Sequence, residues 1–156
     1  MRAFAVTLFA WVAFVAGVLT FTPPCHAAAL RGVIYAAANN GPFCYTFEVD
    51  GQLQNNVNSV ATAGAAFDAL KALIGAQGGT IVLARFNVTN SQEQMVAWIR
   101  PTVANGPFAY AFEVDGSLKT VVNNVATLGA AADAIKALVG AESGTFQRGL
   151  INVVTQ

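Results

Sequence analysis

The stretch GPFCYTFEVDG at residues 41–51 returns 65 positions later as GPFAYAFEVDG at residues 106–116. The match continues without a gap as far as residues 76 and 141, and 25 of the 36 aligned positions are identical. A repeat of this length, present only twice, is typical of two copies of one supersecondary unit rather than of a solenoid. The sequence therefore predicts a tandem duplication in which two copies share one core.

Each copy begins with a pattern that predicts strands. Aromatic residues occupy every second position of residues 43–47, which is the period of a strand with one buried face. Asp50-Gly51 then indicates a tight hairpin, because both residues tolerate a positive φ. We expect an earlier strand over residues 32–36 and a returning strand over residues 53–57.

A helix is expected after the third strand of each copy. Thr62 is a suitable N-cap, and Gly75 stands where the helix should end. Between them, the apolar residues of 63–74 fall on one face at helical spacing, and those of residues 128–139 do the same in the second copy.

These elements predict an α+β fold made of two β-β-β-α-β units with a 65-residue period. Closing strands are expected over residues 80–88 and 145–154. Helices that bury one apolar stripe need a sheet to pack on, so we expect a pseudo-two-fold antiparallel sheet packed on two helices. We assign residues 30–90 to the first unit and residues 94–156 to the second, and expect the two to form one compact domain.

The N-terminal segment, residues 1–27, has the features of a secretory signal peptide. Arg2 is its only charged residue before an apolar run that ends at Phe21, and small residues follow. Cleavage is expected after Ala27 or Ala29. We therefore predict a secreted or periplasmic protein, which would attach to a membrane only if the segment stayed uncleaved.

The chain that remains after cleavage lacks the side chains on which several reaction classes depend. His26 is the only histidine, and Cys44 becomes the only cysteine. Ser-His-Asp and Cys-His catalysis need an imidazole base, and zinc or copper sites need several His or Cys ligands. We therefore expect no enzyme activity, no cofactor and no metal. The charges form no basic run, so a nucleic-acid partner is not expected either.

Glu48 and Glu113 are the carboxylates that deserve comparison, because they occupy equivalent strand positions facing away from the aromatic residues. Glycoside hydrolases use two carboxylates about 5–9.5 Å apart. An internal two-fold axis that brought this pair together would allow a carboxylate-based hydrolase, which we keep as the last alternative. Solvated strand residues are the simpler interpretation.

The backs of the two predicted helices carry alanine where a solvent-facing helix usually carries charge. Alanine is the best helix former, which by itself explains the pattern. Small residues also let another helix or a partner approach closely. The candidate interaction surface consists of these alanines and the two glutamates: Ala65, Ala69, Ala72, Ala130, Ala134, Ala137, Glu48 and Glu113.

These features favour a small exported, non-catalytic binding or interaction protein, with a protein or a glycan of unknown identity as its partner. The alternative is a self-associating structural protein of the envelope or cell surface. Low charge and the apolar C-terminal strand at residues 150–154 support that alternative, because exposed apolar strands pair edge to edge.

Overall fold

The computed structural model describes residues 27–89 and 93–155. Residues 1–26 of the predicted signal peptide, and the predicted ends of the two units at residues 90 and 156, lie outside the described residues. The elements in chain order are β1 (Leu30–Ala36), β2 (Phe43–Val49), β3 (Gln52–Val60), α1 (Ala63–Ala76), β4 (Gly79–Thr89), β5 (Met95–Pro101), β6 (Phe108–Val114), β7 (Ser117–Val125), α2 (Leu128–Ala141) and β8 (Thr145–Thr155).

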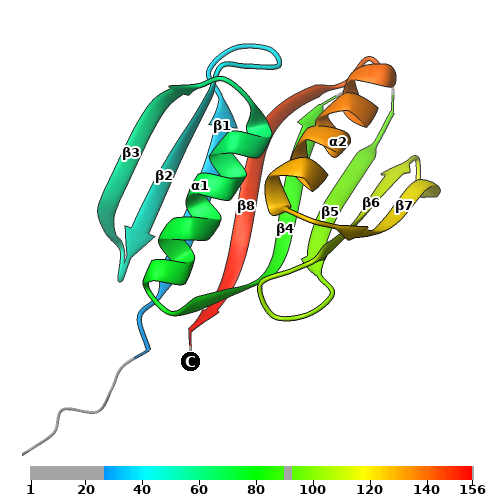
Figure 1. Cartoon of the computed structure of the whole chain (residues 1–156). Coiled ribbons are helices and arrows are strands. Elements are labelled where there is room, and N and C mark those ends of the chain that lie inside the picture. Colours follow the sequence, from blue (N-terminus) through cyan, green and yellow to red (C-terminus); the bar gives the residue numbers. More distant parts are fainter. Residues whose placement is uncertain (1–26, 90–92, 156) are drawn as a thin grey trace, which may run out of the picture.

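The strands form one antiparallel sheet in the order β3-β2-β1-β8-β4-β5-β6-β7. Both helices lie side by side on one face of this sheet, with β3 and β7 at its two edges (Figure 1). No element of the described residues covers the other face, which we call the open face. The predicted α+β class, with an antiparallel sheet and two helices, is confirmed.

β8 lies in the centre of the sheet, and the interpretation of residues 150–154 as a free edge is wrong. Leu150 is paired with Val33 of β1 on one side and with Arg85 of β4 on the other. The edges are β3 and β7, which are rich in polar residues and contain register shifts. Such features discourage edge-to-edge pairing, so the main argument for self-association is lost.

The core lies between the helices and the covered face of the sheet. Phe67 of α1 is fully buried and stacks on Phe86 of β4, with ring centroids 5.1 Å apart. It also lies over Gly149 of β8, where an added Cβ would come within 2.5 Å of the Phe67 ring. A helix of the first half therefore packs on a strand of the second. The aromatic residues predicted to be core are all buried: Phe43, Tyr45, Phe47, Phe108, Tyr110 and Phe112.

Both helices begin as predicted, but they end later. The hydroxyl of Thr62 accepts a hydrogen bond from the N–H of Ala65 at 3.0 Å, and Thr127 caps α2 in the same way. Gly75 lies within α1, which continues to Ala76. Gly78, with φ +70°, has the left-handed conformation that commonly follows a helix C-terminus.

The helices meet at their N-terminal turns through Gly64 and Gly129. A Cβ on Gly64 would lie 2.6 Å from the carbonyl oxygen of Gly129, and one on Gly129 would lie 2.5 Å from that of Gly64. The N–H of Gly129 donates to Oδ1 of Asp68 and the N–H of Gly64 donates to Oδ1 of Asp133, both at 2.8 Å. Neither helix has an acidic residue in its own first turn, so each receives a carboxylate from the other helix at its positive end.

Replacing Asp68 or Asp133 with alanine should lower the free energy of unfolding by about 1–2 kcal/mol, because a part-buried backbone N–H loses its acceptor. Asp68→Asn keeps an acceptor oxygen, so it should lower the free energy of unfolding by less than Asp68→Ala does. Urea denaturation of the three variants measures the difference. Equal stability of Asp68→Ala and the wild-type protein would contradict a structural role for this contact.

Candidate functional site on the open face

The predicted interaction surface is divided between two faces of the molecule. Ala65, Ala72, Ala130 and Ala137 are exposed on the helices, whereas their neighbours Ala69 and Ala134 are half-buried and pack against the core. The close helix approach occurs at the paired glycines of the first turns, not along the alanine stripe.

Glu48 and Glu113 both lie on the open face, but the sheet keeps them apart. β2 and β6 are separated by four strands, which at about 4.8 Å per step places these glutamates roughly 24 Å from each other. That separation is well beyond the distance at which two carboxylates cooperate in glycoside hydrolysis. Glu48 instead forms an ion pair with Arg31, with Oε2 3.5 Å from Nη1.

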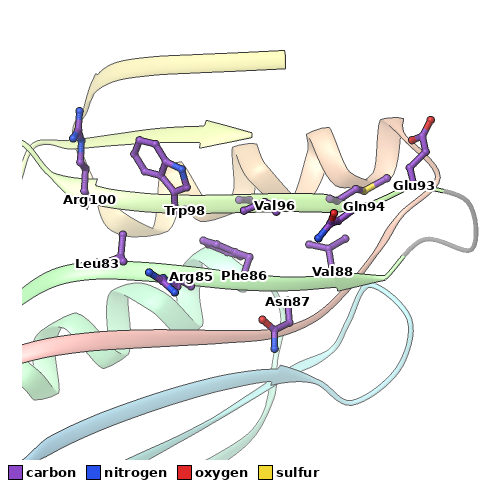
Figure 2. Close-up of a pocket in the computed structure, with 12 residues that line it drawn as sticks. Leu83, Arg85, Phe86, Asn87, Val88, Glu93, Gln94, Val96, Trp98 and Arg100 are labelled. Atoms are coloured by element: carbon purple, nitrogen blue, oxygen red, sulfur yellow. The ribbon is translucent and has the colours of Figure 1, made fainter. Parts of the chain in front are cut away.

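A groove lies where β4 and β5 separate. The two strands pair over only three residues, from Ala84 with Ile99 to Phe86 with Ala97. β4 stays paired with β8 as far as Thr89, and β5 stays paired with β6 as far as Met95. The resulting groove has a volume of about 840 Å³ (Figure 2), which falls in the range typical of small-ligand sites.

The groove combines a polar rim with an apolar floor. Arg85 is paired directly with Trp98 across the two strands. Arg100 follows two residues after Trp98, and its guanidinium carbon lies 5.3 Å from the centre of the Trp98 ring. These three side chains belong to the open face, since alternate residues of both strands point into the core. Buried lining residues form the floor: Phe86, Met95 and Ala97.

Trp98 and Arg100 rise from the same side of β5 (Figure 2). Their cross-strand partners on β6 are Ala111 and Ala109, which are 0% and 2% exposed although no described element covers this face. The alanines are small enough for the two large side chains to lie over them. Trp98 is half-buried and lines the groove.

The open face gathers all four arginines of the described residues. Arg31 and Arg148 lie on β1 and β8, and Arg85 and Arg100 border the groove. Within the described residues, only Arg31 takes part in an ion pair. Strand pairing therefore places four arginines on one face of the sheet, although the sequence contains no basic run.

The two halves of the protein differ most at this site. α1 and α2 are identical at 10 of 14 positions, whereas β1 and β5 are identical at only one of seven. Val33 stands at the position equivalent to Trp98, and Tyr35 at the position equivalent to Arg100. The helices and core are thus similar in the two halves, whereas the open-face residues of β1 and β5 differ at every position. This difference between the two halves is the sequence signal that could have located the groove.

No protein-family model, curated protein or solved structure matches this chain. Among the described helices, neither has the length and apolar character needed to cross a membrane. In the same part of the chain, no three His, Cys, Asp or Glu side chains come together as a potential metal site.

Proposed function

We propose that this is a small exported, non-catalytic binding protein that holds an anionic ligand in the groove between β4 and β5. The observation that carries the proposal is the arrangement of Arg85 and Arg100 around Trp98. Both arginines line an open groove, and neither forms an ion pair within the described residues.

The chemistry of these side chains favours an anion with a flat group beside it. A guanidinium donates two parallel hydrogen bonds to a carboxylate or phosphate, and this geometry adds specificity to charge attraction. An indole offers a large apolar surface at low conformational cost. A ligand with a negative group and an adjacent ring could use both at once.

A tandem duplication accounts for the scaffold on which this groove lies. Read inward from either edge, the sheet presents strands of equivalent position in the two halves. We propose that a 65-residue unit was duplicated, that the helices and aromatic core were retained, and that the open face of β5 then diverged. One groove per chain follows from this history. The proposal of export to the periplasm or the medium rests on residues 1–27 alone.

The test is a binding panel at constant ionic strength with dicarboxylates, acidic and neutral oligosaccharides, and acidic peptides. We expect an anionic probe to bind the wild-type protein, and the Arg85→Ala/Arg100→Ala double variant to bind it at least about 10-fold more weakly, as loss of a charge-assisted hydrogen bond implies. Arg148→Ala is the matched control, since Arg148 is an open-face arginine outside the groove lining. Failure of every anionic probe, or equal binding by the double variant, would contradict the proposal.

A further inference from the structure

We infer that the open face docks on a membrane surface rich in anionic phospholipids, and that the anion held in the groove is the phosphate of one such lipid. This inference rests on the proposed function above and adds the source of the ligand. It follows from three features of the four central strands, β1, β8, β4 and β5: their charge, their aromatic residues and their exposed valines.

The four central strands carry only positive charge. Each contributes one arginine to the open face, and none of the four contains an aspartate or a glutamate. Glu48 and Glu113 flank these strands on β2 and β6. The other acidic residues of the described chain lie on the helices or between elements: Asp50, Asp68, Glu93, Asp115, Asp133 and Glu142. This uneven distribution of charge turns the open face toward an anionic surface.

The arginines are spread too widely for one small anion to use them all. β1 and β5 are three strand spacings apart, which is about 14 Å. An anion held between Arg85 and Arg100 leaves Arg148 without an ion-pair partner among the described residues. A membrane surface presents many phosphates that diffuse in its plane, so each guanidinium can meet one without a fixed spacing between them.

Both aromatic residues of the open face stand beside an arginine. Tyr35 is paired directly with Arg148, and Trp98 is paired directly with Arg85. Tyrosine and tryptophan are enriched at the headgroup level of membranes, because their rings are apolar and their polar atoms can reach water. The apolar surface of Trp98 then contacts the glycerol region of a lipid whose phosphate the groove arginines hold.

Exposed valines lie among these charged side chains. Val96 and Val154 are 42% and 54% exposed. They share the open face with Trp98 and Leu150, because residues two or four apart in a strand point to the same side. Apolar side chains beside basic ones favour contact with an anionic bilayer, since binding gains both from buried apolar area and from charge attraction.

An acidic protein or polymer is the competing occupant of this face. Its carboxylates stand at positions fixed by a chain, whereas lipid headgroups rearrange to meet the arginines. A soluble polyglutamate therefore serves as the competing probe.

The experiment uses residues 28–156, the predicted mature chain, which contain every described helix and strand. The apolar run that ends at Phe21 would bind vesicles by itself, and its removal also leaves Trp98 as the only tryptophan. The contact inferred here does not need that segment, through which alone the sequence predicts a membrane attachment. Circular dichroism checks that the chain and its variants fold.

Two kinds of vesicle are compared by sedimentation and by Trp98 fluorescence: pure phosphatidylcholine, and phosphatidylcholine with about one third phosphatidylglycerol. We expect the protein to bind the anionic vesicles at least about 10-fold more tightly than the neutral ones. The emission of Trp98 should shift to shorter wavelength as the indole leaves water. Added salt should release the protein, because it screens the charges.

Arg148→Ala distinguishes a membrane from a soluble ligand. It should weaken binding to the anionic vesicles about fivefold, as Arg85→Ala should, because each basic residue near an anionic surface contributes separately. It should leave the binding of inorganic phosphate unchanged, since Arg148 lies outside the groove lining. Lys136→Gln is the matched control, because it removes the same charge from α2, on the covered side of the sheet. It should change vesicle binding by less than about twofold.

The outcomes separate this inference from the proposed function. If a soluble anion binds through Arg85 and Arg100 but the anionic vesicles bind no better than the neutral ones, the membrane assignment is overturned and the proposed function stands. If Arg148→Ala leaves vesicle binding unchanged, or Lys136→Gln weakens it equally, the open face is not the contact and the assignment is also overturned. Tighter binding to polyglutamate than to the anionic vesicles, at equal concentrations of carboxylate and phosphatidylglycerol, would overturn it in favour of an acidic polymer. If neither a soluble anion nor an anionic vesicle binds, both proposals fail together.

Discussion

Gly129→Ala is expected to lower the free energy of unfolding by about 2–4 kcal/mol, although alanine is the better helix former by about 1 kcal/mol. The new methyl group would come within 2.5 Å of the carbonyl oxygen of Gly64 and would crowd the Asp68 carboxylate. A backbone oxygen cannot rotate away, so the helices must move apart. The overpacking cost then adds to the loss of the hydrogen bond that Asp68 accepts.

Gly140→Ala is the matched control, because Gly140 lies in the same helix and a Cβ there would meet nothing within 4 Å. It should leave stability unchanged or raise it by up to about 1 kcal/mol. Urea denaturation followed by circular dichroism gives both values. Similar stabilities for the two variants would show that the helices do not depend on their contact at Gly64 and Gly129.

Phe67→Ala is expected to lower the free energy of unfolding by about 3–5 kcal/mol, as is usual when a large aromatic side chain is removed from a core. Phe67 is fully buried and contacts both Phe86 and Gly149, which come from different halves of the chain. Ala132 holds the equivalent position in α2, so the opposite helix has no matching ring to fill the cavity. Leu53→Ala is the control, since Leu53 is 57% exposed on an edge strand and its loss should change stability by about 0.5 kcal/mol or less.

The Phe67→Ala variant also tests whether the two halves share one core. In a chain that also carries Trp11→Phe, fluorescence reports on Trp98 in the second half, whereas circular dichroism reports on the whole fold. Phe67 belongs to the first half, yet both signals should shift to lower urea concentration together, as expected of a two-state transition. A fluorescence transition that keeps its wild-type midpoint would mean that the halves unfold independently.

Most of the secondary structure could be predicted from local patterns. The alternating aromatic residues of β2 and β6 are buried as their period requires, and Thr62 and Thr127 cap their helices. The sequence predicts an end of α1 at Gly75, which is too early, because the helix continues to Ala76. Glycine does not by itself end a helix, and here Gly78 is the residue with positive φ.

The candidate site was not predictable in the same way. The sequence pattern pointed to helix alanines and to two glutamates, which the sheet separates by about five strand spacings. The two glycines at the helix crossing looked like ordinary helix residues, because nothing in the local sequence shows which backbone they will approach. Nothing in the local sequence shows that Asp68 and Asp133 each accept a hydrogen bond from the first turn of the other helix.

By itself, then, the sequence determined the two equivalent sets of strands and helices and the residues that form the core, because hydrophobic periodicity and capping act over a few neighbouring residues. Only the tertiary structure decided that β8 lies in the centre of the sheet, that the helices touch through glycine, and that Arg85 stands beside Trp98. Those features depend on strand order and register between segments far apart in the chain. A shift of one residue in the pairing would turn every groove side chain to the other face.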